Sequence, residues 1–167
     1  MVKLEILSPA KTADYGIAAI NHGADAVYIA AQRFGAREAA GNSWADIERV
    51  VKYAHRYFAK VYLTLNTIIY EHELEDAQST ATQAYNIGCD ALIIQDMALL
   101  EMDLPPIPLH ASTQTNNLDV EKVKFLESVG FSRVVLGREL SLQEISNIRK
   151  QTNVELEGFE HTQADKC

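Results

Sequence analysis

The sequence predicts an α/β fold: an incomplete TIM-type (β/α) barrel with about seven parallel strands. Short apolar runs alternate with amphipathic segments along the 167 residues, which is typical of parallel strands joined by helical crossovers. One loop pattern recurs at Gly23, Gly88 and Gly130, where a helix ends on glycine and a buried strand follows. Polar residues also occupy every second position of several strands, which suits a barrel lumen better than a sheet covered on both faces.

Turn and cap signals divide the chain into its elements. Pro9 is expected to end the first strand, and Ser43 to cap the second helix. Ser141 and Glu144 match a capping box that opens the last helix. The expected strands are 4–8, 26–30, 61–65, 91–95, 108–115, 133–137 and 154–159. The expected helices are 12–21, 44–55, 72–86, a short one after 96, 119–129 and one that begins after 141.

Two architectures fit this order of elements: an open doubly wound sheet and part of a (β/α)₈ barrel. We favour the barrel because of the alternating polar positions. A closed barrel needs eight strands and typically about 250 residues. The chain is therefore expected to be truncated, with open sheet edges. Residues 1–160 would form this partial barrel, and 161–167 a divergent C-terminal tail.

Composition excludes some classes of function and names none. The net charge is −8 and the pI is near 5.1, which argues against a broad phosphate-binding surface. No apolar run approaches the roughly 20 residues of a membrane helix, so we expect a cytoplasmic protein without membrane contact. The two cysteines, Cys89 and Cys167, lack zinc-like spacing, and Cys89 is expected to be a small buried hydrophobe. No metal site is predicted.

The stretch 108–115 carries the most distinctive pattern. Read as a strand, it places His110, Ser112 and Gln114 on one face, and such a face must look into a polar network or a site. His110 is either a structural histidine or a base. Ser112 is a weaker candidate for a nucleophile, because no Gly-x-Ser-x-Gly elbow surrounds it.

Glu155 and Glu157 share a face of the last strand, where they could bind a cation or pair with a lumen arginine. The catalytic candidates are therefore His110, Ser112 and Glu157.

Other polar residues lie where strands end, which is where sites form in parallel α/β folds. Arg138 and Glu139 belong to this group, although they could equally form a structural ion pair. The residues expected to contact substrate are Lys11, Arg33, Asn66, Gln95, Asp96, Gln114, Arg138 and Glu139.

Seven motifs in one order resemble the N-terminal region of the collagenase-like peptidase family of unassigned mechanism. They are 5–10 (EILSPA), 22–28 (HGADAVY), 33–35 (RFG), 61–67 (VYLTLNT), 95–96 (QD), 110–114 (HASTQ) and 138–141 (RELS). The resemblance implies a TIM-barrel-like domain. Some members carry a peptidase label, whereas others support hydroxylation of RNA bases or of ubiquinone precursors.

In the hydroxylation members, the family pattern implies an iron–sulfur cluster held by four cysteines. The first of these follows a His-Gly-Ala-x-Cys pattern after the seventh strand. Here His161 is followed by Thr162 and Gln163, and Cys167 comes two positions late. One thiolate cannot replace a set of four, so no cofactor is expected in this chain.

We therefore predict a peptidase of the collagenase-like family, present as an incomplete or inactive fragment. One alternative is a fragment of an iron–sulfur-dependent hydroxylation protein acting on RNA bases or ubiquinone precursors. Another is a non-catalytic binding module that self-associates through its open sheet edges. The expected partner is a peptide, an RNA or a small aromatic substrate. In the RNA alternative, Arg33, Arg37 and Arg138 are expected to make the contacts.

Overall fold

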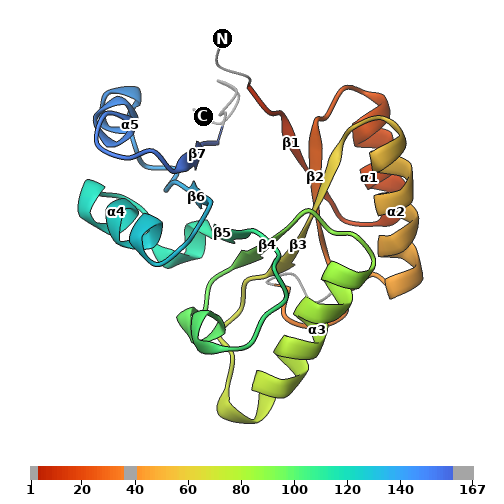
Figure 1. Ribbon diagram of the computed structural model, residues 1–167. Helices are drawn as coiled ribbons and strands as arrows, with labels where there is room; N and C mark the ends of the chain where they lie inside the picture. Colours follow the sequence, from red (N-terminus) through yellow and green to blue (C-terminus); the bar gives the residue numbers. More distant parts are fainter. Residues whose placement is uncertain (1–3, 36–40, 160–167) are drawn as a thin grey trace, which may run out of the picture. The chain divides into compact units, whose positions relative to one another are not determined.

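The computed structural model describes residues 4–35 and 41–159, and its elements are labelled in Figure 1. The chain divides into two compact units, Met1–Pro108 and Leu109–Cys167, which are described separately. Within each unit, every paired strand is parallel to its neighbour. The predicted fold class, an α/β incomplete barrel with seven parallel strands, is confirmed. Arg37, His161 and Cys167, like the predicted tail 161–167, lie outside the described residues.

The first unit is a four-stranded sheet in the order β1-β2-β3-β4, with helices between successive strands (Figure 1). Its apolar strand residues are buried almost completely, and they include Val27, Leu63 and Leu92. The elements are β1 (Leu7–Ala10), α1 (Ala13–Asn21), β2 (Ala26–Ala30), α2 (Trp44–Arg56), β3 (Lys60–Leu65), η2 (Glu71–Glu73), α3 (Leu74–Asn86), β4 (Ala91–Ile94) and η3 (Met97–Glu101).

One face of this sheet buries a tyrosine among apolar residues. This face presents Ala26, Tyr62, Ala91 and Ile93 as a cluster. Tyr62 is 1% exposed, and its hydroxyl donates to Glu5 Oε1 at 2.7 Å. A buried phenol needs such a partner. In β3, where Val61 to Leu65 are all buried, Tyr62 thus places a polar atom between the apolar residues Val61 and Leu63.

The prediction that Pro9 ends the first strand is wrong. Pro9 lies inside β1, paired in register with Tyr28 of β2. Proline removes a backbone donor, which an edge strand tolerates on its unpaired side. In the order of the first unit, β1 is such an edge strand.

The second unit contains three short strands in the order β5-β6-β7 (Figure 1). Its registers pair His110 with Arg133, and Arg133 with Glu155. The elements are β5 (Leu109–Ala111), η4 (Thr113–Thr115), α4 (Val120–Ser128), β6 (Arg133–Val135), α5 (Leu142–Arg149) and β7 (Glu155–Glu157).

The fifth strand is shorter than the predicted 108–115. It ends at Ala111, and Ser112 caps η4 by accepting the N–H of Gln114 at 3.2 Å. The prediction that His110, Ser112 and Gln114 share one strand face is therefore wrong, because the strand ends at Ala111 and the chain turns. Alternation of polar and apolar residues also fits a strand that ends in a capped turn.

The predicted caps are confirmed. Ser43 Oγ accepts the N–H of Asp46, and Ser141 forms a capping box with Glu144. The glycines of the recurring loops all have positive φ, between 91° at Gly88 and 103° at Gly130, as the left-handed end of a helix requires. None of the helices in the described ranges is long and apolar enough to cross a membrane.

Candidate functional site

Arg33 and Phe34 follow the carboxyl end of β2. The Arg33 guanidinium lies over the Phe34 ring, 4.9 Å from its centroid. Arg33 also pairs with Asp76 of α3, and its Nη2 lies 3.6 Å from Glu73 Oε1. Phe34 is 5% exposed and has φ 64°, a conformation that few aromatic residues adopt. Arg33, predicted to bind substrate, is thus held by two carboxylates of its own unit.

Asp96 and Asn42 connect neighbouring loops of the first unit. The Asp96 carboxylate accepts the N–H of Ile69 at 2.9 Å with one oxygen and that of Ala98 with the other. Asn42 Nδ2 donates to the carbonyls of Lys11 and Ala30. Asp96 therefore holds the loop after β3 against the start of η3, a structural task that the sequence pattern did not indicate.

The remaining candidates of this unit lie at the same strand ends. The N–H of Asn66 donates to the Phe34 carbonyl at 2.9 Å, so Asn66 follows β3 directly beside the Arg33 loop. The side chain of Lys11 is exposed, and Gln95 is half-buried. A substrate role for these three residues stays a prediction.

A buried arginine organises the polar face of the second unit. Arg133 is 7% exposed, and its Nη2 lies 2.7 Å from Glu155 Oε2 while its Nη1 lies 3.6 Å from Glu157 Oε2. His110 is its register partner on β5, and register partners face the same side of a sheet. Of the two roles considered for Glu155 and Glu157, the structure shows pairing with an arginine. Such pairing is what a buried guanidinium requires.

Ser112 does not have the geometry of an activated nucleophile. Its Oγ accepts the Gln114 N–H, and no hydrogen bond joins it to His110 within the described ranges. Its carbonyl accepts the Nδ2 of Asn117 at 2.9 Å, and the same Nδ2 donates to the Val135 carbonyl at 2.8 Å. Asn117 is fully buried and ties the loop after β5 to the end of β6. Its side chain gave no signal in the sequence beyond a turn-like Asn-Asn pair.

Arg138 and Glu139 separate in the structure. The Arg138 guanidinium lies over the ring of Phe159, 4.5 Å from its centroid. Glu139 folds back over Gly137, where an added Cβ would come within 2.9 Å of its Oε2 and 2.2 Å of Leu118. The ion pair considered for Arg138 and Glu139 is not present among the described residues. A side chain at position 137 would therefore displace the outer ends of the Leu118 and Glu139 side chains.

The described cysteine does not fit the cluster that the family implies. Cys89 is buried, and burial followed by the neighbouring Asp90 carboxylate raises the pKa of its thiol to about 12. Thiolates, not thiols, hold iron–sulfur clusters. The described ranges also contain no group of three or more His, Cys, Asp or Glu side chains placed to hold a metal ion. The expectation that Cys89 is a small buried hydrophobe is confirmed.

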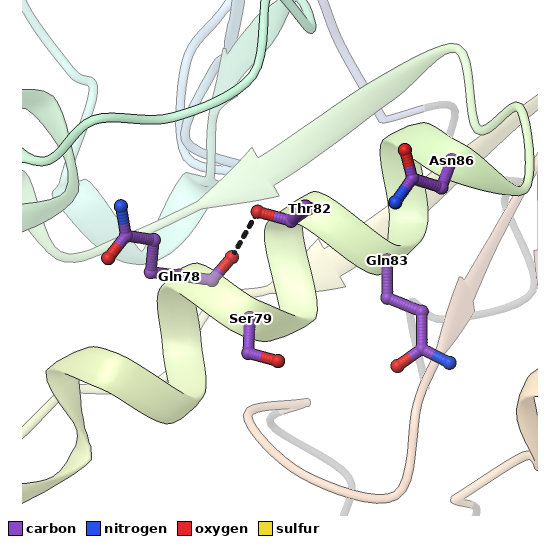
Figure 2. Close-up of a pocket in the computed structure, with 5 residues that line it drawn as sticks. All are labelled: Gln78, Ser79, Thr82, Gln83 and Asn86. Atoms are coloured by element: carbon purple, nitrogen blue, oxygen red, sulfur yellow. Dashed lines mark hydrogen bonds between the residues drawn. The ribbon is translucent and has the colours of Figure 1, made fainter.

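A shallow pocket on α3 is shown in Figure 2. It is lined by side chains of this one helix, and Thr82 Oγ1 donates to the Gln78 carbonyl at 2.9 Å. Its lining carries amides and hydroxyls without a charged or nucleophilic group. The lining residues are Gln78, Ser79, Thr82, Gln83 and Asn86. We assign no chemistry to it.

The fold and the residues at the strand ends can be compared with known proteins. The sequence profile of peptidase family U32 matches residues 11–164. The chain belongs to peptidase family U32. The structure of the U32 peptidase Mk0906 superposes with a TM-score of 0.77 at 17% identity, covering 95% of this chain and 69% of that one. This likeness supports the fold alone.

Two relatives from Escherichia coli K12 have names that refer to RNA. A "23S rRNA 5-hydroxycytidine C2501 synthase" is 54% identical over 95% of this chain and 24% of the relative. A "tRNA hydroxylation protein P" is 34% identical over 96% of this chain and 37% of the relative. The chain thus spans about a quarter to two fifths of these relatives. Their names favour the hydroxylation alternative over the peptidase prediction.

Proposed function

We propose that the chain is the RNA-recognising barrel segment of a protein that hydroxylates a cytidine of 23S ribosomal RNA. The observation that carries the proposal is the 54% identity to the 23S rRNA 5-hydroxycytidine synthase, which extends over 95% of this chain. The tRNA hydroxylation protein, at 34% identity, supports the same class of substrate. A ribosomal substrate would place this action in the cytoplasm.

The polar residues at the strand ends fit recognition better than hydrolysis. Peptide hydrolysis by a serine requires a hydroxyl in contact with a base that a third group orients. Ser112 Oγ is used as a cap, while the Arg133 guanidinium faces the same side as His110 and pairs with Glu155. The Arg138 guanidinium, in contrast, is an exposed positive charge after the end of β6.

The proposal assigns no redox step to residues of this chain. The oxidising chemistry would require a cofactor, and the described residues hold no ligand set that fits one. In this proposal, the segment binds and orients the RNA.

A chimera tests the proposal. In an Escherichia coli strain without the 23S rRNA synthase, the segment of that synthase matching this chain is replaced by this chain. We expect 5-hydroxycytidine to return to 23S rRNA, because residues that recognise the target would be shared. Mass spectrometry of nucleosides from purified 23S rRNA measures it.

The matched control is a chimera carrying the corresponding segment of tRNA hydroxylation protein P, which should not restore the modification. A chimera with this chain that accumulates to the level of the native synthase and yields no 5-hydroxycytidine would contradict the proposal. Release of peptides from gelatin by the purified chain would favour hydrolysis instead.

A further inference from the structure

Two arginine-on-aromatic stacks lie at strand ends, and they differ in their surroundings. In the Arg33 stack the guanidinium, although exposed, pairs with Asp76 and Glu73, and its ring, Phe34, is 5% exposed. The Arg138 stack is open. Phe159 is 38% exposed, Arg138 is exposed, and within the described ranges no carboxylate pairs with it.

Backbone pairing brings the open stack together. The N–H of Leu136 donates to the Glu157 carbonyl at 2.8 Å, so the segments after β6 and β7 leave the sheet side by side. Two residues further along each segment, Arg138 and Phe159 meet at 4.5 Å.

An exposed guanidinium plane on an exposed ring can bind a flat aromatic group that carries a negative charge beside it. Nucleobases stack on aromatic rings and on guanidinium planes, and the phosphates beside them attract the cation. We propose that Arg138 and Phe159 form a stacking platform that binds one unpaired base of single-stranded RNA. This inference rests on the proposed function, since it names the residues that would hold the RNA.

Alanine variants of the full chain test the platform by binding alone. The probe is a short fluorescein-labelled single-stranded RNA of mixed cytidine and adenosine, and fluorescence anisotropy measures its Kd. Losing one stacked base weakens binding by about 5- to 100-fold. We expect Arg138→Ala and Phe159→Ala each to raise the Kd by an amount within this range. Arg138→Lys should raise the Kd less than Arg138→Ala but more than not at all, because lysine keeps the charge without the planar group.

Two control variants make the same chemical changes elsewhere. Arg56→Ala removes an exposed arginine at the end of α2. Phe125→Ala removes an aromatic ring that is 49% exposed and lies under Lys122, 5.9 Å from Nζ to the ring centroid. Both should leave the Kd within about twofold of the parent value. Unfolding midpoints of all variants are measured, and Phe159→Trp, which keeps a ring, covers the case in which Phe159→Ala fails to fold.

The Phe159→Trp variant also reports contact directly. Stacking should quench its added tryptophan fluorescence with the intact RNA, and an abasic RNA of the same length should leave it unchanged. Equal Kd values for the parent, Arg138→Ala and Phe159→Ala would overturn the platform and leave the chimera test of function untouched. Absence of RNA binding by the parent chain would also overturn it. A gelatin-derived peptide that displaces RNA from the parent but does not bind Arg138→Ala would reassign the surface to peptides.

Discussion

Single residues decide what the loops of this protein can do. Arg33 and Arg138 are the same residue type at equivalent places after strands, yet Asp76 pairs with the first and Phe159 stacks on the second. Ser112 is a hydroxyl at a strand end, but the N–H of Gln114 occupies it. The residue types therefore indicated where polar side chains gather. The groups that each side chain contacts determined which of them can still bind a ligand.

Asn117 allows a test of how much the hydrogen-bond partners of one loop residue contribute to stability. Its Nδ2 donates to two buried carbonyls and its Oδ1 accepts the Thr115 hydroxyl at 2.7 Å. Asn117→Ala would remove the amide donor from the Val135 carbonyl, whereas the Ser112 carbonyl and the Thr115 hydroxyl keep each other as partners. A buried group left unpaired costs about 1–3 kcal/mol, and we expect the free energy of unfolding to fall by about that amount in urea denaturation.

The adjacent asparagine is the control for that prediction. Asn116 is exposed and has φ 60°, so Asn116→Gly should change the free energy of unfolding by less than about 1 kcal/mol. If Asn117→Ala were as stable as Asn116→Gly, the loop after β5 would not depend on the buried amide.

At the scale of elements, capping residues explain why helices begin where they do. Ser141 Oγ accepts the Glu144 N–H, and the Ser141 N–H donates to Glu144 Oε2 at 2.8 Å. The Ser141 hydroxyl, which donates to Glu144 Oε2 at 2.7 Å, and then the Ser141 backbone N–H lower the pKa of the Glu144 carboxyl. The carboxylate form is thus the one that the folded helix favours.

The sign of this shift gives a pH dependence. A lowered pKa in the folded state adds stability above the ordinary glutamate pKa, and that stability is lost as the pH falls through the lowered value. Ser141→Ala should destabilise the chain by about 1 kcal/mol at neutral pH, and by less at about pH 3. Urea denaturation at both pH values measures the difference.

Glu144→Gln is the companion variant, because it keeps a hydrogen-bond acceptor without a titrating carboxyl. Adding Ser141→Ala to it should cost nearly the same at both pH values. A Ser141→Ala effect that does not shrink in acid would show that the Glu144 carboxylate contributes nothing to the cap.

For the whole molecule, the strands at the two ends of the strand order decide whether the chain can self-associate. In the described ranges β1 pairs only with β2, and β7 only with β6. Edge strands expose backbone groups that can pair with another chain. Pro9 in β1 and the glutamates of β7 are features that oppose such pairing. Self-association through these edges stays a prediction.

We expect that association to be weak and to depend on concentration. Size-exclusion chromatography with light scattering should show a molar mass that rises with protein concentration, and Ser8→Lys in β1 should reduce the rise, because a charged side chain opposes pairing at an edge. Leu142→Ala, far from both strands in sequence, is the control. A monomer mass at every concentration would contradict edge pairing.

Local sequence signals predicted most of the fold. Apolar periodicity identified seven strands and the helices between them, because strand and helix repeats are properties of short segments. Ser43, Ser141 and the loop glycines marked helix ends for the same reason. The predicted strand limits were wrong in two places: Pro9 fits within β1 because this edge strand has a neighbour on one side only, and β5 stops at Ala111 because the chain turns there into η4.

The sequence predicted at which strand ends the candidate residues lie, but it did not predict which residues they contact. The strand-end positions follow from the order of elements, and the resemblance to one family named the same residues. Tertiary structure alone decided their partners. Arg33 reaches Asp76 across 43 positions of sequence and Arg133 reaches Glu155 across 22, and no local pattern encodes such pairs. Charge neutralisation depends on what folding brings within a few ångströms, so only the fold distinguishes the paired Arg33 from the open stack of Arg138 on Phe159.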